Sequence, residues 1–174
     1  NMGVTKLNQD PYPEEALPVI THDKGMTLYF NDEKIDILHF GPAHTTGDSI
    51  IYFNNSNAIH FGDVFFSDSY PFIDVDNGGS ISGVINFLEE ATKIMNSETI
   101  VMPGHGNIAN LSDVIETIEM LKVVKSKIAN MINEGKTLQE VFDAKPTKEF
   151  DNKYDISSIG YFIDRVYASL KKDD

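Results

Sequence analysis

Residues 41–63, GPAHTTGDSIIYFNNSNAIHFGD, decide the fold, because they read as a loop, a strand, a tight turn and a second strand. Residues 50–53 and 58–61 are apolar, β-prone runs. The NNSN sequence between them contains Asn, which tolerates the left-handed backbone that tight hairpins need. His44 lies in the loop that enters the hairpin, and Asp63 lies in the loop that leaves it. Because these two positions lie at the same edge of an antiparallel hairpin, we expect the side chains to be neighbours.

A third candidate side chain, His105, follows the apolar strand predicted at residues 99–102 and is flanked by Gly104 and Gly106. Glycines beside a ligand let the backbone turn sharply and approach closely. Imidazole nitrogen and carboxylate oxygen bind zinc-class metals at about 2.0–2.2 Å. A single loop histidine is more often an ordinary polar residue. His44, Asp63 and His105 each adjoin a strand and have glycine nearby, so together they favour a metal site.

The spacing of three short motifs makes the comparison with a known family specific. H-T-x-G-D begins at His44 and ends at Asp48, G-D ends at Asp63, and P-G-H-G contains His105. In order and spacing, residues 34–105 resemble the second half of the metallo-β-lactamase-fold hydrolase superfamily. The resemblance implies an α/β protein with a four-layer αββα sandwich. It also implies that His44 binds one metal, that Asp63 bridges two metals and that His105 binds the second, while Asp48 orients the site without binding a metal.

The chain also departs from that family. The H-x-H-x-D-H motif is absent, and the histidines upstream of His44 are His22 and His39, neither of which has its spacing. In the family that motif supplies three further histidines and the aspartate associated with the nucleophilic water. We therefore interpret the chain as the C-terminal portion of a longer enzyme, without the N-terminal strands of the fold. The alternative is a natural homologue that has lost both the motif and the chemistry.

Composition limits the partners. A length of 174 residues predicts one domain spanning 1–174. The net charge of −13 disfavours binding to nucleic acid and to anionic membranes, both of which need clustered Lys and Arg. The chain contains no Cys, which excludes disulfides and thiolate metal ligands within it. No apolar run is long enough to cross a membrane. No targeting peptide is visible, so we expect a soluble protein whose compartment, cytoplasmic or exported, stays open.

Periodicity predicts the remaining elements. A hairpin is expected over residues 27–40, and amphipathic helices over residues 82–95, 110–134 and 157–170. His39 and His60 are interpreted as structural strand residues. The sixteen-residue loop 64–79 forms either one wall of the substrate cleft or a small aromatic core of its own. Lys and Arg are absent from residues 64–92, where β-lactam-cleaving members hold the substrate carboxylate, and this argues against β-lactamase activity.

The sequence leaves two functions open. The first is a metal-dependent hydrolase with up to two zinc ions in its complete domain, acting on a small-molecule ester, lactone, thioester or phosphodiester. The second is a non-catalytic scaffold or binding module that retains a vestigial metal half-site. Three ligands shared by two metal positions leave each under-coordinated, so this chain alone is expected to have partial or no zinc occupancy and little activity. Missing N-terminal strands are expected to expose sheet edges and to cause homo-oligomerisation.

Overall fold

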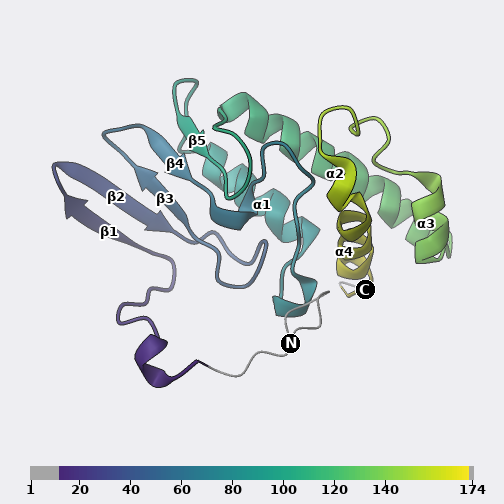
Figure 1. Cartoon of the computed structure of the whole chain (residues 1–174), viewed down its shortest axis with the longest axis horizontal. Helices are drawn as coiled ribbons and strands as arrows, with labels where there is room; N and C mark the ends of the chain where they lie inside the picture. Colours follow the sequence, from purple (N-terminus) through teal and green to yellow (C-terminus); the bar gives the residue numbers. More distant parts are fainter. Residues whose placement is uncertain (1–11, 173–174) are drawn as a thin grey trace.

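The computed structural model describes residues 12–172, which form one five-stranded sheet and four α-helices (Figure 1). The expected mixed α/β class is confirmed. The expected domain 1–174 includes residues 1–11 and 173–174, which lie outside the described residues. The strands are β1 (Gly25–Phe30), β2 (Glu33–Leu38), β3 (Ile50–Phe53), β4 (Ala58–His60) and β5 (Ile100–Met102). The helices are α1 (Ile81–Thr92), α2 (Leu111–Asn133), α3 (Leu138–Ala144) and α4 (Ile159–Lys172).

The sheet follows chain order, β1-β2-β3-β4-β5, because β1, β2 and β3 each pair antiparallel with the next strand along the chain, through tight turns after β1 and β3 and the longer loop 39–49 after β2. Asn31 and Asp32 both take positive φ angles, 50° and 59°, which matches the right-handed twist of the flanking strands. Asn57 has φ 48° in the turn between β3 and β4. β5 instead pairs in parallel with β4, after the crossover through α1. The predicted hairpin of residues 41–63 is therefore confirmed.

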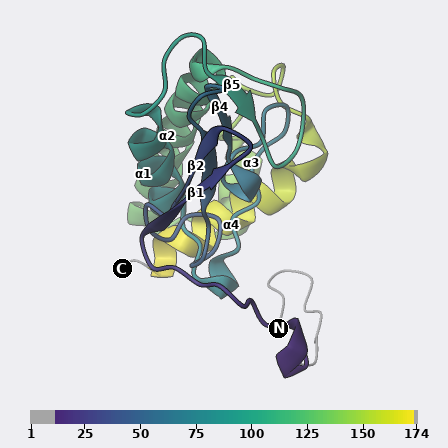
Figure 2. The same cartoon turned by 90° about the vertical axis from the view of Figure 1, so that its left-hand side faces the viewer.

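One face of the sheet carries the core. The register places Ile50, Ile59 and Val101 on the same face, and all three are fully buried. Figure 2 views the sheet from its β1 side, with α1 and α2 to one side of it. The apolar stripes of these helices, which include Phe87 and Leu121, belong to the same hydrophobic core as the sheet residues. The core thus lies between the sheet and its helices, as expected for a layered α/β arrangement.

The three predicted helices are present with shifted ends: residues 81–92 against the expected 82–95, 111–133 against 110–134, and 159–172 against 157–170. Asn110 and Thr137 each form a capping box, at the first turns of α2 and α3 respectively. Gly135 takes φ 78° just beyond the end of α2. The last helix starts two residues later than expected, because residues 156–158 form a 3-10 turn (η5, Ile156–Ser158). No helix among residues 12–172 is long and apolar enough to cross a membrane.

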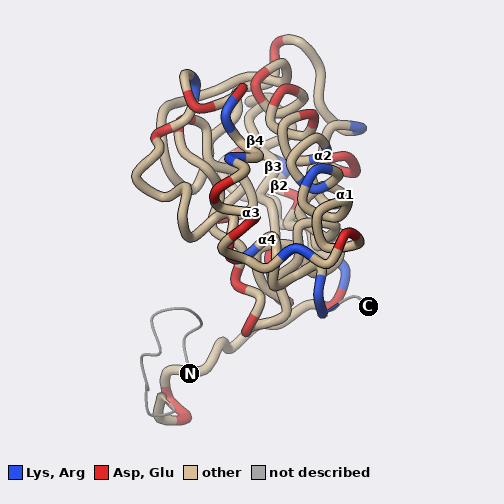
Figure 3. The backbone as a smooth tube through the Cα atoms, turned by 90° about the vertical axis from the view of Figure 1, so that its right-hand side faces the viewer, with Lys and Arg blue, Asp and Glu red and all other residues tan. Residues whose placement is uncertain are grey.

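Lys and Arg residues are interspersed with Asp and Glu residues along the helices and their connecting loops (Figure 3). Some pair between elements: Lys122 of α2 lies 2.8 Å from Glu89 of α1, and Lys127 lies 2.7 Å from Glu149 in the segment after α3. These pairs are largely exposed, so each contributes at most about 1 kcal/mol.

The opposite face of the sheet is apolar but contributes nothing to the core of the described chain. We call it the open sheet face. Three of its side chains are strongly exposed: Leu28 at 41%, Ile100 at 49% and Phe30 at 67%. Its remaining apolar members, placed by the register, are Met26, Ile35, Ile37, Ile51, Phe53, Ala58 and Met102. The described residues thus build one sheet and one helical layer of the expected four-layer sandwich, and the exposed apolar surface is a sheet face as well as an edge.

Candidate metal centre

The structure brings together the three side chains that the sequence singled out. Asp63 follows β4 in a short 3-10 turn (η3, Gly62–Val64), His44 lies in the loop before β3, and His105 lies beyond the end of β5. One carboxylate oxygen of Asp63, Oδ2, lies 3.8 Å from Nε2 of His44. The other oxygen, Oδ1, lies 3.3 Å from Nε2 of His105. The carboxylate therefore lies between two imidazoles, each facing a different oxygen.

A hydrogen bond fixes the orientation and tautomer of His44. Its Nδ1 lies 2.8 Å from the main-chain carbonyl oxygen of Phe72, and a carbonyl can only accept. Nδ1 therefore carries the proton and donates it, which leaves the lone pair of Nε2 facing Asp63. A metal-binding histidine is typically held in this way, with its second ring nitrogen bonded to a carbonyl or carboxylate. The His44 side chain is only 14% exposed, so packing also restricts its rotation.

Asp48 holds the loop that carries His44. Its two carboxylate oxygens accept from the main-chain N–H of Thr45 at 2.8 Å and from the Thr45 hydroxyl at 3.0 Å. The Thr45 hydroxyl oxygen in turn accepts from the N–H of Gly47 at 3.2 Å. These bonds tie down the backbone directly after His44. Asp48 thus acts on the loop conformation, which fits the orienting role that the resemblance implies.

Gly104 allows the strand ends to approach closely. A Cβ at this position would lie 2.4 Å from the carbonyl oxygen of Gly62 and 2.6 Å from Oδ1 of Asp63. Both distances are well inside van der Waals contact, and one of the obstacles is main chain. A side chain at Gly104 would therefore displace the turn that presents Asp63, so the glycine before His105 is a geometric requirement of the site.

Two aromatic residues of the loop 64–79 contact the imidazoles, and the sequence did not identify them. The centroids of the Phe66 and His105 rings lie 4.5 Å apart, and an isolated parallel β-bridge joins the backbones of these two residues. The Phe72 ring lies 5.8 Å from the His44 ring. Phe65 and Tyr70 of the same loop are fully buried in the core. The loop therefore lies beside the candidate centre, while Phe65 and Tyr70 join the main hydrophobic core. The alternative expectation, a separate aromatic core of the loop's own, is not met.

The other three histidines lie outside this group. Nδ1 of His60 accepts from the N–H of Gly62 at 3.1 Å, which supports the turn before Asp63. His39 donates from Nδ1 to the Asp48 carbonyl at 2.6 Å and packs edge-on against Phe87. His22 and His39 line a separate cavity. These placements agree with the structural roles expected for His39 and His60.

The donor set fits part of a metal centre. Each imidazole has one Asp63 oxygen opposite it, so each of two metal positions would gain one nitrogen and one shared carboxylate. Across the described range 12–172, no group of three or more His, Asp or Glu side chains is arranged to hold one ion by itself. Asp63 and His105 are 47% and 62% exposed, which leaves their outer sides open to water or to further ligands.

Comparisons with solved structures show the fold. The described architecture is similar to a metallo-β-lactamase from Pontibacter korlensis, with a TM-score of 0.53 and 14% identity over 60% of this chain and 49% of that one. It is also similar to the inverting sec-alkylsulfatase Pisa1 from Pseudomonas sp., with a TM-score of 0.69 and 12% identity over 86% of this chain and 26% of that one. No family model and no curated protein matches the sequence.

These likenesses establish that the chain has the architecture of the C-terminal portion of the metallo-β-lactamase fold, and the matched proteins are hydrolases. The chain spans about half the length of that metallo-β-lactamase and about a quarter of that alkylsulfatase. At identities of 12–14% the likeness concerns the fold alone, and the chemistry has to be argued from the site.

Proposed function

We propose that this chain carries one side of a two-zinc centre of a hydrolase, with His44 on one ion, His105 on the other and Asp63 between them. The observation that carries the proposal is the position of the Asp63 carboxylate, 3.8 Å and 3.3 Å from the two Nε2 atoms. A carboxylate can bridge two metals by offering one oxygen to each, and here each oxygen of Asp63 faces a different imidazole. The hydrogen bond from His44 to Phe72 supports the same role, because it leaves Nε2 free to bind.

When bound, a metal pair about 3.5–4 Å apart lowers the pKa of a water ligand and polarises the scissile group. The residues of this chain set the geometry for that chemistry. Asp63 fixes the separation of the two positions, because both imidazoles face its oxygens. Asp48 and the Phe72 carbonyl restrict the position of His44. The backbone bridge between Phe66 and His105 restricts the position of His105.

The substrates that fit this chemistry are small esters, lactones, thioesters and phosphodiesters. The likeness to an alkylsulfatase adds sulfate esters to this class. Residues 64–92 contain no Lys or Arg, so the loop beside the centre has no cation to bind a substrate carboxylate. This composition continues to favour substrates other than β-lactams.

One observation favours the competing function, a non-catalytic scaffold or binding module with a vestigial half-site. The described residues supply two nitrogens and one carboxylate, and none of their groups completes an ion site alone. A module of this kind would keep the fold and the half-site geometry without turning over a substrate.

Zinc binding and ester hydrolysis separate the two functions. We expect this chain to bind zinc weakly and to hydrolyse 4-nitrophenyl acetate little faster than free zinc does. A longer polypeptide that carries an upstream H-x-H-x-D-H run is expected to bind about two equivalents and to hydrolyse the ester efficiently. In that polypeptide Asp63→Asn should lower the rate at least about 100-fold. A longer gene product without such a run, or without zinc-dependent hydrolysis, would favour the scaffold.

A further inference from the structure

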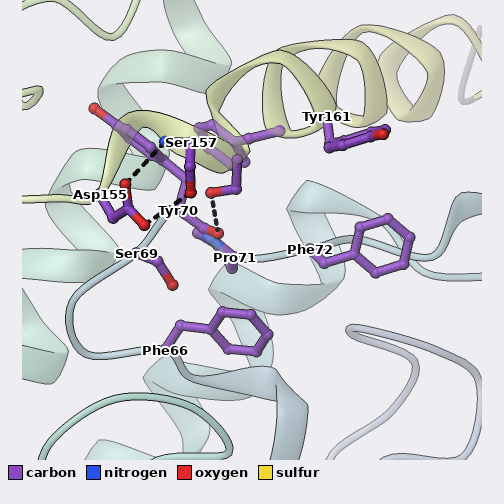
Figure 4. A pocket seen from close by; sticks show the side chains of 10 residues that line it. Phe66, Ser69, Tyr70, Pro71, Phe72, Asp155, Ser157 and Tyr161 are labelled. Atoms are coloured by element: carbon purple, nitrogen blue, oxygen red, sulfur yellow. Dashed lines mark hydrogen bonds between the residues drawn. The ribbon is translucent and has the colours of Figure 1, made fainter.

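A cavity of about 210 Å³ lies between the loop 64–79 and the start of α4 (Figure 4). Figure 4 shows the rings of Phe66, Phe72 and Tyr161 around its opening. Its apolar and aromatic lining consists of Phe66, Tyr70, Pro71, Phe72, Tyr161 and Phe162. The cavity is held open by well-packed neighbours, since Phe162 stacks on the buried Tyr70 ring at 5.0 Å.

This aromatic cavity shares two of its walls with the candidate metal centre. Phe66 lines the cavity and also contacts the His105 ring at 4.5 Å. Phe72 lines the cavity, its ring lies 5.8 Å from that of His44, and its carbonyl accepts from the same histidine. The cavity is therefore one aromatic ring away from both imidazoles, within reach of a substituent on a small substrate bound between them.

The Asp155, Ser157 and Ser158 side chains of the cavity lining are engaged in hydrogen bonds. The Asp155 carboxylate accepts from the Ser157 N–H at 2.9 Å and from the Ser157 hydroxyl at 2.8 Å. These two bonds lower the pKa of Asp155, so this side chain is ionised near neutral pH. The Ser158 hydroxyl donates to the Tyr70 carbonyl at 3.4 Å. No Lys or Arg lines the cavity, so an anionic ligand would meet a negative charge without a compensating cation.

We propose that the aromatic cavity is a substrate subsite for an uncharged aryl or compact alkyl substituent. An apolar cavity of about 150 Å³ holds a benzene ring, so about 210 Å³ accommodates a phenyl ring with a short linker. The lining offers ring faces for edge-to-face or offset contact with such a group. The assignment as a substrate subsite rests on the proposed hydrolase function, whereas ligand binding in the cavity can be measured without metal.

A matched pair of probes tests the cavity: phenylacetamide and phenylacetate, which differ in charge at nearly equal size. Each is titrated into the ¹⁵N-labelled chain without metal and followed by amide chemical shifts. We expect phenylacetamide to bind in the millimolar range, as an efficiency of about 0.3 kcal/mol per heavy atom implies. The shifts should concentrate at residues 66–72 and 155–162. Phenylacetate should bind about 5-fold more weakly because of Asp155.

Variants locate the binding. Tyr161 is 61% exposed on α4, and Tyr161→Ser is expected to weaken phenylacetamide binding about 3–10-fold. The matched control is Tyr29→Ser, since Tyr29 is 79% exposed on β1 and lines no part of this cavity; it should leave the affinity unchanged. Equal effects of the two variants, shifts elsewhere in the chain, or phenylacetate binding as tightly as phenylacetamide would each overturn the proposal. Absence of phenylacetamide binding overturns the cavity alone. A longer polypeptide with the upstream H-x-H-x-D-H run that binds phenylacetamide but shows no zinc-dependent ester hydrolysis overturns the hydrolase alone.

Discussion

Replacing Gly104 with alanine should damage the fold and the candidate metal centre together. The new methyl carbon would lie 2.4 Å from the Gly62 carbonyl oxygen and 2.6 Å from Oδ1 of Asp63. Restoring ordinary van der Waals contact requires a movement of about 1 Å in the turn after β4. Overpacking of this kind costs about 1–3 kcal/mol. For a chain of 174 residues this corresponds to a fall of about 2–12 °C in Tm.

The same displacement should weaken zinc binding. A shift of about 1 Å in Asp63 moves its two carboxylate oxygens away from the imidazoles that they face, Oδ2 from His44 and Oδ1 from His105, and we expect the zinc affinity to fall about 10–100-fold. Urea unfolding and a zinc titration measure the two effects on one sample. Gly47→Ala is the control, because a Cβ at Gly47 meets nothing within 4 Å. If Gly104→Ala kept both the unfolding midpoint and the zinc affinity of the wild type, the close-approach reasoning would be wrong.

Three further perturbations test other parts of the structure. Lys34 and Thr27 donate to Asp36 and lower its pKa from 3.8 to about 2. The stability that ionised Asp36 contributes is therefore present above about pH 4 and is lost as the pH falls toward 2. Urea unfolding should show the free energy of unfolding falling by about 1–2 kcal/mol over that range, and by less in Asp36→Asn. Phe30→Glu on the open sheet face should shift self-association toward monomer in sedimentation, and a monomeric wild type at high concentration would contradict the expected oligomer. Asp48→Ala removes the two bonds to Thr45 and should weaken zinc binding about 10-fold, whereas an unchanged zinc affinity would show that the loop keeps its shape without them.

The hairpin of residues 41–63 was predictable because its determinants are local. Turn chemistry at Asn57 and the apolar runs on either side fix the register, and the register brings His44 toward Asp63. His105 depends on a parallel pairing between β4 and β5, which local sequence does not specify. Its position was expected from the family resemblance, since the P-G-H-G motif follows an apolar strand.

The path of the loop 64–79 could not be predicted in the same way. Its aromatic content indicated either a cleft wall or a small core, but periodicity does not tell Phe65 from Phe66. Tertiary contacts give these two neighbours their different positions. The backbone of Phe66 pairs with that of His105, and Phe65, the residue before it along the chain, therefore faces the core. The open sheet face was missed for a related reason. The strand pattern places Ile35 and Ile37 on one face, and only the register shows that this face, with Ile51 and Phe53, lies away from the helices.

The proposed function depends first on the candidate metal centre. The most direct measurement is a zinc titration of the chain with selectively ¹⁵N-labelled histidine, followed at the imidazole nitrogens. We predict that zinc shifts Nε2 of His44 and His105 and leaves His22, His39 and His60 unchanged, and that Asp63→Asn abolishes both shifts. A response at the other histidines, or an Asp63→Asn variant that binds zinc as the wild type does, would contradict the assignment of Asp63 as the bridging ligand.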